Sequence, residues 1–330
     1  MSRKSREIKK VLVIKLGDLG GFVQALGAMK RIREAHPKAR ITLLTTPPYE
    51  ALAKSSPYFN AVDADGRPSG PGEWMALIGR LRAAKYDRIY DLQNSSQTTG
   101  LRGMLGPFPP EWSGVAAGAS HQQKGKGRER MHALERDADQ LRIAGIWDDA
   151  PITPGSAPPP DLSWILRKAP APRPVAGGVK PRPFVLLVPG GSERKKDKRW
   201  PIDYYADLAA ILSRQGLDIV VVGGPEESAL ARAIQRKAQA RDLTGRTDFA
   251  QIAILAARSA LAVGNDTGPL HLIAAAGAPT LALFAKSSDP VLHGPRGHVT
   301  VMRADNLADL PVAEVARACQ HLMPADLQPR

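Results

Sequence analysis

A carboxylate stands inside a glycine-rich turn near the start of the sequence. Residues 15–21 read KLGDLGG, with Asp18 between Gly17 and the pair Gly20 and Gly21. Turns of this kind let backbone amides approach a phosphate closely, and a carboxylate would repel that phosphate. Asp18 therefore either contacts a ligand other than phosphate or, more simply, caps the helix that follows.

Three further loops combine glycine with polar residues, and each follows a predicted strand. They read PGGSERKKDKRWP (189–201), GGPEES (223–228) and GNDTGPLHL (264–272). In the last, Asp266 or Thr267 is placed to cap a helix that begins near Gly268, which leaves free backbone amides at a positive helix end. A phosphate suits such a site, although the same stretch also makes an ordinary turn and helix cap.

The loop at 189–201 favours the anion-binding interpretation. It begins Gly190–Gly191–Ser192, where amides can approach an anion, and it continues with a run of cations: Arg194, Lys195, Lys196, Lys198 and Arg199. So many like charges repel one another unless they are solvated or matched by anions. The loop is not a Walker motif, but its position beside a second anion-binding turn predicts phosphate binding.

The elements that must position these loops alternate between strand and helix. In the first half, VLVIKL (11–16), ITLLTT (41–46), NAV (60–62) and DRIYDL (87–92) read as strands, and 22–35 and 73–85 read as helices. In the second half, FVLLVPG, DIVVVGG, SALAVGN, TLALFA and VTVMR read as strands between helices at 201–216, 225–239, 248–258 and 268–277. Such alternation is typical of parallel sheets with helices on both faces.

A proline-rich segment separates the two halves. We therefore predict an α/β chain of two Rossmann-like, doubly wound domains: residues 1–150, a linker at 151–182 and residues 183–330, with a last helix that can pack back on the first domain. Open parallel sheets bind ligands at the carboxyl ends of their strands, so we expect the four loops to face a central cleft between the domains.

Composition narrows the class of partner. The 330 residues carry a net charge of +14, which calls for an anionic partner such as nucleic acid, a phospholipid surface or a phosphorylated substrate. Aromatic residues are only 5% and do not alternate with the basic clusters, so a base-stacking platform for nucleic acid is not expected.

The single cysteine, Cys319, excludes disulfides and multi-cysteine metal sites within one chain. With no apolar segment long enough to span a bilayer and no signal core, we expect a cytoplasmic protein.

Three long segments resemble glycosyltransferase family 9, the ADP-heptose:lipopolysaccharide heptosyltransferases. They are VLVIKLGDLGGFVQALGAMKRIREAHPKARITLLT (11–45), VPGGS with DKRWPIDYYADLAAIL (188–212), and DLTGRTDFAQIAILAARSALAVGNDTGPLHLIAAAGAPTLALF (242–284). The resemblance covers most of the chain in order, and GNDTGPLHLIAAAGAPTLALF is its most specific part. It implies a GT-B fold, inversion at the anomeric carbon and no required metal or other cofactor.

The resemblance also implies roles for residues of the first loop. By resemblance, Asp18 is the general base that takes the proton of the acceptor hydroxyl, with the pyrophosphate held by the other domain. Gly17, Gly20 and Gly21 then let the acceptor come close and the helix pack.

In the second domain, the resemblance places the donor nucleotide sugar. Lys198 is expected to be the principal cation on the departing β-phosphate, with Gly191, Ser192 and the amides of Thr267 and Gly268 as donors. Asp266 is expected to contact hydroxyls of the donor sugar. His271, one helical turn further on, is a structural partner or an acid. Glu226 or Glu227 is expected to reach the ribose, with no choice between them.

The expected activity is transfer of heptose from ADP-heptose to a lipopolysaccharide core or related lipid-linked glycan. The basic N-terminus and the cluster at 124–130 are expected to hold the enzyme at the anionic inner face of the inner membrane. Two alternatives stay open: a family member that uses another nucleotide sugar, and a non-catalytic anion- or nucleotide-binding module. A nicotinamide dehydrogenase is disfavoured, because the first loop is not GxGxxG and the second strand lacks an acidic end. The loops at 65–72 and 113–130 and Ala285 depart from the family pattern, which leaves the acceptor unidentified.

Overall fold

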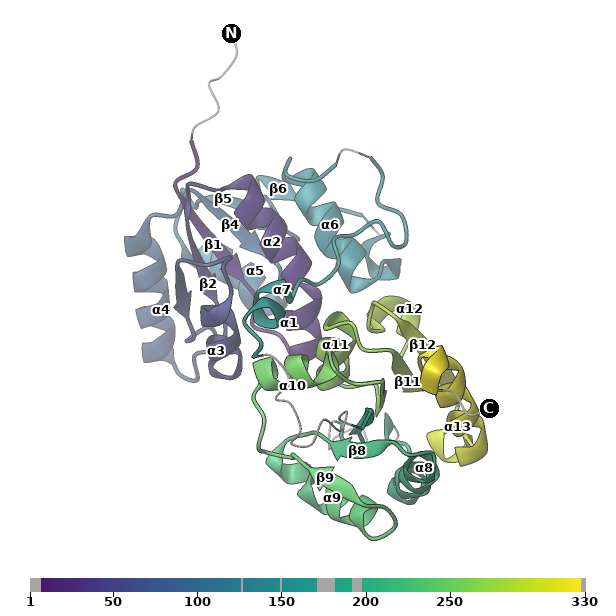
Figure 1. The fold of residues 1–330 in the computed structure, drawn as a ribbon. Coiled ribbons are helices and arrows are strands. Elements are labelled where there is room, and N and C mark those ends of the chain that lie inside the picture. Colours follow the sequence, from purple (N-terminus) through teal and green to yellow (C-terminus); the bar gives the residue numbers. More distant parts are fainter. Residues whose placement is uncertain (1–6, 126, 149, 171–181, 192–197, 328–330) are drawn as a thin grey trace. The chain divides into compact units, whose positions relative to one another are not determined.

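The chain divides into two compact units, Met1–Asp161 and Leu162–Arg330. The computed structural model describes residues 7–125, 127–148, 150–170, 182–191 and 198–327 (Figure 1). The division between the units lies inside the proline-rich segment that the sequence marks as a linker. Each unit is built around its own parallel sheet.

The described part of the first unit contains a six-stranded parallel sheet in the order β3-β2-β1-β4-β5-β6. Its central strand, β1, is buried on both faces, as its uninterrupted apolar sequence predicts. The strands are β1 (Lys10–Ile14), β2 (Arg40–Leu44), β3 (Ala61–Asp63), β4 (Arg88–Asp91), β5 (Glu111–Gly114) and β6 (His121–Gln122).

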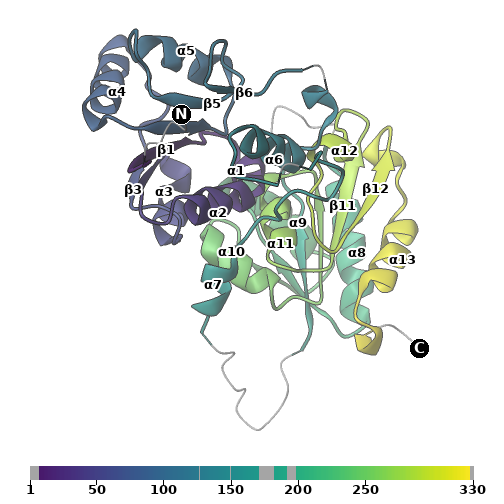
Figure 2. The same ribbon diagram turned by 90° about the horizontal axis from the view of Figure 1, so that it is seen from above.

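Helices cover both faces of this sheet, as Figure 2 shows from above. They are α1 (Leu19–Gln24), α2 (Leu26–Ala35), α3 (Pro47–Ser55), α4 (Pro71–Ala84), α5 (Ser96–Met104) and α6 (Ala133–Ile143). On one face, α4 and α5 contribute Leu77, Leu81 and Leu101 to a buried cluster with Leu12 and Ile14 of β1. On the other face, α6 packs against α1 and α2.

The second unit repeats this topology with a sheet in the order β9-β8-β7-β10-β11-β12 in its described residues. The strands are β7 (Phe184–Val188), β8 (Asp218–Val221), β9 (Ala240–Asp242), β10 (Leu261–Asn265), β11 (Thr280–Ala285) and β12 (Val299–Ala304). In each sheet the first strand of the unit lies centrally, between the second and fourth strands of that unit. This is the Rossmann strand order, in which ligands bind beyond the carboxyl ends of the first and fourth strands.

The helices of the second unit follow the same logic. They are α7 (Ser163–Arg167), α8 (Ile202–Arg214), α9 (Ser228–Gln235), α10 (Phe249–Ala256), α11 (Gly268–Ala275), α12 (Pro290–His293) and α13 (Val312–Leu322). One face of the sheet is covered by α8, α9 and α13, which share a buried cluster with alternate residues of the strands, such as Val185 and Leu187. The last helix, α13, buries Val315, Cys319 and Leu322 in this core of the second unit.

The α/β, doubly wound prediction is confirmed, with differences in detail. The helix expected at 22–35 is broken at Ala25 into α1 and α2. Five helices and strands of the first unit, α3, α5, β5, β6 and α6, have no counterpart in the prediction. Helix α6 (ALERDADQLRI) escapes a periodicity argument because it buries charged residues, including Glu135 and Asp137, beside its leucines.

Candidate functional site

A buried asparagine organises the carboxyl edge of the second sheet. Asn265, the last residue of β10, has no exposed surface. Its Oδ1 accepts hydrogen bonds from the backbone of Trp200 and the hydroxyl of Tyr205, each at 3.0 Å. Its Nδ2 donates to the carbonyls of Pro189 (2.9 Å) and Gly190 (3.0 Å). One side chain therefore fixes both ends of the loop at 189–201, a role that the sequence analysis missed because it depends on contacts about 70 residues away.

The next residue, Asp266, is the centre of a charged cluster. Lys198 Nζ and Ser288 Oγ both donate to Asp266 Oδ2, each at 2.6 Å. The side chains of Lys198 and Asp266 are 14% and 11% exposed, so this ion pair is largely removed from water. The ammonium has three N–H donors, so a lysine held by Asp266 can still donate to a ligand.

Charge and hydrogen bonding keep Asp266 ionised. Burial alone would raise the pKa of Asp266, but the hydrogen bonds from Lys198 and Ser288 outweigh it and hold the pKa below its ordinary value. His271, also nearly buried, lies with Nε2 at 4.0 Å from Asp266 Oδ1. The structure thus brings together Lys198, Asp266 and His271, which the sequence predicted, and adds Ser288, which it did not.

A second carboxylate of this unit sits in a cradle of glycines. Glu227 Oε1 accepts from the amide of Gly191 at 3.0 Å, and its Oε2 accepts from the amide of Gly224 at 2.7 Å. A Cβ on Gly190 would lie 1.4 Å from Oε1, and one on Gly223 would lie 2.1 Å from Oε2. Burial raises the pKa of Glu227 in spite of these amides. A side chain at either position would push the Glu227 carboxylate away from the amides that it contacts.

This contact bears on one expectation for the donor side. The amide of Gly191, expected to serve an anionic ligand, donates to Glu227 in this structure, and its contact with the donor stays a prediction. Arg199, the other described cation of the loop, donates to the carbonyl of Gly191. Glu226, next to Glu227 in the sequence, is exposed. Ser192, Arg194, Lys195 and Lys196 lie outside the described residues.

The helix that follows Asp266 starts as expected but without the expected cap. Thr267 is the N-cap residue of α11, yet neither its hydroxyl nor the Asp266 carboxylate bonds a first-turn amide. The Asp266 side chain is diverted to Lys198 and Ser288. The α11 N-terminus at Gly268, with Pro269 in its first turn, therefore keeps amides that no side chain of the described chain caps.

In the first unit, Asp18 follows β1 and caps α1. Its Oδ1 accepts from the amide of Gly21 at 2.7 Å, so the helix-cap interpretation of this residue is correct as far as it goes. The residue is exposed, and its Oδ2 has no hydrogen bond among the described residues. The cap fixes the carboxylate while leaving one oxygen available to a ligand.

The glycines of this loop have room around them. Gly17, Gly20 and Gly21 do not adopt positive φ. A Cβ on Gly17 would lie 3.6 Å from its nearest neighbours, and one on Gly21 would lie 3.4 Å from Asp18 Oδ1. Neither the backbone conformation nor packing in the free protein therefore demands glycine at 17 or 21, which leaves approach of a ligand as the reason we put forward below.

The loop after β4 holds the first loop in place. Leu16 N donates to Gln93 Oε1, and Lys15 Nζ donates to the carbonyl of Leu92, both at 3.0 Å. Asp91, the last residue of β4, is fully buried. Burial raises the pKa of Asp91 to about 6, although its Oδ1 accepts from the amides of Asn94 and Gln93.

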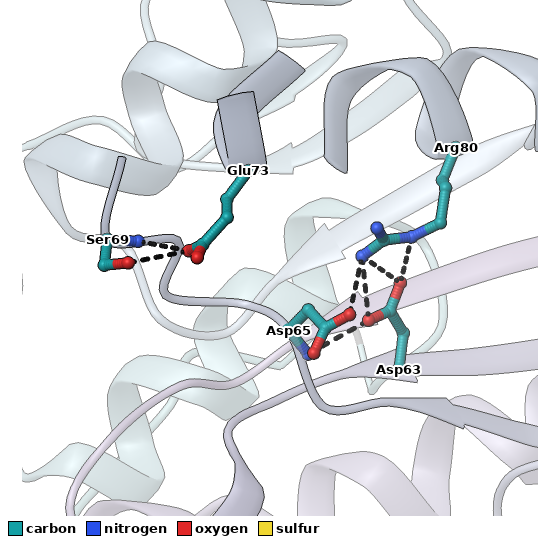
Figure 3. A network of polar contacts seen from close by, with 5 residues as sticks. All are labelled: Asp63, Asp65, Ser69, Glu73 and Arg80. Atoms are coloured by element: carbon teal, nitrogen blue, oxygen red, sulfur yellow. Dashed lines mark hydrogen bonds and ion pairs between the residues drawn. The ribbon is translucent and has the colours of Figure 1, made fainter. Parts of the chain in front are cut away.

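The loop after β3 is ordered by surface ion pairs, drawn in Figure 3. Arg80 of α4 contacts Asp63 and Asp65, each with a nitrogen to oxygen distance of 3.2 Å. Ser69 donates to Glu73 Oε2 through its amide (2.7 Å) and its hydroxyl (2.9 Å). Exposed pairs add little stability, so their effect is on the shape of this loop.

Arg67 of this loop and Asp18 both act on Tyr49 of α3. Between the ion pairs, the amide of Gly66 donates to Thr45 O at 2.8 Å, which fixes the loop above the end of β2. Burial raises the pKa of Tyr49; the negative charge of Asp18 raises it further, and the positive charge of Arg67 opposes both. Tyr49 is therefore within electrostatic reach of both charges.

Two Rossmann-like units in one chain, each with polar residues at the carboxyl ends of its first and fourth strands, are the components of the GT-B fold. Residues 74–317 match the profile of glycosyltransferase family 9 (heptosyltransferase), and the chain belongs to this family. It is accordingly a glycosyltransferase, as the resemblance implied.

Known relatives agree with this membership. The chain is 27% identical over 311 residues to lipopolysaccharide heptosyltransferase 2 of Escherichia coli K12, which covers 84% of this chain and 83% of the relative. The solved structure of E. coli ADP-heptose lps heptosyltransferase II matches with a TM-score of 0.73 at 23% identity, covering 95% of this chain and 98% of that one. E. coli heptosyltransferase WaaC with ADP matches with a TM-score of 0.76 at 19% identity, covering 95% and 99%.

The described helices are too short or too polar to cross a membrane.

Proposed function

We propose that this glycosyltransferase moves heptose from ADP-heptose to a hydroxyl of a lipopolysaccharide core, with inversion at the anomeric carbon and without a metal. The observation that carries the donor side is the Lys198–Asp266 pair at the carboxyl ends of β7 and β10, where a Rossmann-like sheet binds its ligand. The relatives whose names specify ADP-heptose and lipopolysaccharide support the choice of sugar and acceptor.

On the donor side, the leaving group is a nucleoside diphosphate. Its departure adds negative charge to the β-phosphate, which preorganised donors must stabilise. We assign this role to Lys198 and to the amides at the start of α11, Thr267 and Gly268. Asp266, held by Ser288, then contacts hydroxyls of the donor sugar, and His271 supports Asp266 from the other oxygen.

We assign contact with the ribose to Glu226. Both oxygens of Glu227 are engaged by the amides of Gly191 and Gly224, and this carboxylate joins the two glycine turns. Glu226 is exposed on the same loop and has no hydrogen bond among the described residues. Ser192 stays a proposed phosphate contact beyond the described residues.

On the acceptor side, Asp18 is the proposed general base. Its Oδ2 takes the proton as the acceptor oxygen attacks the anomeric carbon, the bond from that carbon to the diphosphate breaks, and ADP leaves with the electron pair. The acceptor can approach this loop closely because the loop has no side chains at Gly17, Gly20 and Gly21.

A calorimetric titration with ADP, UDP and GDP in the absence of metal tests the donor assignment. We expect selective binding of ADP, and loss of that binding in Lys198→Ala. Preference for UDP or GDP would replace heptose by another sugar. Absence of binding to all three would overturn the proposed function and favour a non-catalytic module.

We further propose that the acceptor is lipid-linked and that the protein works at the cytoplasmic face of the inner membrane. Lys124 and Arg130 of the cluster at 124–130 are exposed, each able to add about 1 kcal/mol near an anionic surface. Arg128 of the same cluster is half-buried and bonded to Gln123 at 2.9 Å, so it is not available as a solvated charge. The N-terminal cluster lies largely outside the described residues.

Vesicle sedimentation tests this association. We expect binding to vesicles with anionic phospholipid at low salt, weakened by high salt and by Lys124→Glu with Arg130→Glu. Equal binding to neutral vesicles, or no effect of salt, would contradict an electrostatic attachment.

A further inference from the structure

A nearly buried carboxylate of the first unit has no partner among the residues that the structure describes. Asp137 of α6 is 7% exposed, yet it makes no hydrogen bond or ion pair with any described residue. Buried carboxylates are almost always paired, because an unmatched buried charge is costly. An exception of this kind calls for a ligand.

The position of Asp137 places it at the carboxyl edge of the sheet. Gln140, one helical turn later on the same face of α6, donates to the carbonyls of Asp91 and Ser113, at the ends of β4 and β5, both at 3.1 Å. Helix α6 begins at this edge, since it follows β6, so Asp137 lies one turn further out than Gln140. The carboxylate therefore lies beside the loops after β1 and β4.

The charge in those loops with the largest effect on the pKa of Asp137 is that of Lys15. Burial raises the pKa of Asp137, and Lys15 is the first of three cations that oppose this shift, followed by Arg136 and Arg128. The stem of Lys15 lies along the first loop: its Cε is 3.6 Å from the place of a Cβ on Gly17 and 3.8 Å from that on Gly21. Lys15 thus connects the surroundings of Asp137 with the loop that carries Asp18.

Lys15 and Asp137 act on each other without touching. In the described part of the chain no ion pair joins them, and Lys15 Nζ donates to the carbonyl of Leu92. A group that fits between an ammonium and a carboxylate must accept a hydrogen bond from the ammonium and donate one to the carboxylate. An alcohol does both through one oxygen, whereas a phosphate or carboxylate would be repelled by Asp137.

We propose that Asp137 binds a hydroxyl group of the saccharide acceptor, with Lys15 donating to the same oxygen. This inference rests on the proposed function and adds a residue of the acceptor subsite, distinct from the base Asp18. Asp137 fixes the orientation of the acceptor and takes no proton from the reacting hydroxyl. Its lack of a partner among the described residues keeps this place open for the ligand, at a cost in stability.

The test is Asp137→Asn, which keeps the size of the side chain and removes its charge. The matched control is Asp139→Asn on the same helix, where the carboxylate is already engaged by Arg142 (2.8 Å) and Gln123 (2.9 Å). The measurements are steady-state transfer from ADP-heptose to the core oligosaccharide of a heptose-deficient lipopolysaccharide, ADP release without acceptor, ADP binding by calorimetry and Tm.

We expect Asp137→Asn to raise the acceptor KM by about 10- to 100-fold, the loss of a hydrogen bond to a charged group. At saturating acceptor, kcat should stay within about threefold of the wild type. Acceptor-independent ADP release and ADP binding should not change, and Tm should be unchanged or higher because an unmatched charge is removed. Asp139→Asn should leave the acceptor KM unchanged.

Other results would overturn the inference. An unchanged acceptor KM would show that Asp137 does not touch the acceptor. A lower Tm with a proportional loss of all activities would show a structural role, and loss of kcat at saturating acceptor would make Asp137 the base. If the wild-type protein bound no ADP, the proposed function would fail as well, which separates the two conclusions.

Discussion

The two sheets share one topology but differ in the residue that ends the fourth strand of each unit. In the second unit this position is Asn265, a neutral side chain with all of its bonds made inside the protein. In the first unit it is Asp91, a buried acid whose pKa rises to about 6. Further from the strands, Asp266 is paired with Lys198, whereas in the described chain Asp18 keeps one oxygen unbonded and Asp137 has no partner.

This difference fits two kinds of ligand. A diphosphate carries its own charge, so the donor edge is built from cations and amides that are already held in place. An alcohol is neutral and gives a proton, so the acceptor edge keeps Asp18 to take that proton and Asp137 to accept a hydrogen bond from another hydroxyl. The comparison predicts that substitutions in the two units have separable effects.

The largest effect is expected from Asp18→Asn. Transfer should fall by about 10²- to 10⁴-fold, because the proton of the acceptor hydroxyl loses its acceptor. Asparagine is also a good helix cap, so the fold should be kept. The measurement is kcat for transfer beside ADP affinity, and an equal loss of both would contradict the assignment of Asp18 to the acceptor side.

Lys198→Ala should lower kcat by about 10²- to 10³-fold, comparable to removal of one donor from an oxyanion site. It should also weaken ADP binding, because the diphosphate loses its cation. The matched control is Lys237→Ala, which breaks an exposed ion pair with Asp207 at 2.7 Å. Similar kinetic losses in both variants would show that the effect is not specific to the donor edge.

Asn265→Ala should destabilise the second unit by about 3 kcal/mol, since it leaves several buried polar groups without partners. Because Asn265 holds both ends of the loop at 189–201, ADP affinity should fall in parallel. Urea unfolding together with calorimetry checks this. Full ADP affinity in a destabilised variant would show that the loop is positioned by other contacts.

Asp91→Asn should raise the free energy of unfolding, where Asn265→Ala lowers it, and the size of this gain should depend on pH. The folded-state pKa of Asp91 rises from 3.8 to about 6, so ionisation of Asp91 costs stability as the pH rises through this range. A shift of this size corresponds to about 3 kcal/mol. Asparagine should therefore stabilise the protein by up to this amount at pH 7–8, with the gain vanishing near pH 4. A gain that is the same at pH 4 and pH 8 would rule out ionisation as its cause.

The smallest effect on the fold is expected from Gly21→Ala. A Cβ fits 3.4 Å from Asp18 Oδ1, and alanine favours helix α1 by about 0.5–1 kcal/mol. Stability should rise slightly while the acceptor KM increases, because the methyl group narrows the approach to Asp18. An unchanged KM would mean that Gly21 does not face the acceptor.

Sequence reasoning located what is determined locally. Buried strands read as continuous apolar runs, and the loops after them lie at the carboxyl edge, so the loops that carry Asp18, Lys198 and Asp266 could be found in advance. The choice of these residues within the loops came from the family resemblance. Ser288 and Asn265 could not be assigned, because their roles come from hydrogen bonds to distant segments. Asp137 escaped because it lies in a helix rich in charged residues, where burial cannot be read from the pattern. Glu227 was noticed, but its use of the Gly191 amide depends on the close approach of two turns.

The most direct test of this division of labour is metal-free ADP calorimetry on the wild type, Lys198→Ala and Asp18→Asn. We expect tight binding by the wild type and by Asp18→Asn, with loss of binding in Lys198→Ala. Loss of ADP affinity in Asp18→Asn, with affinity kept in Lys198→Ala, would contradict the assignment of donor and acceptor to the two units.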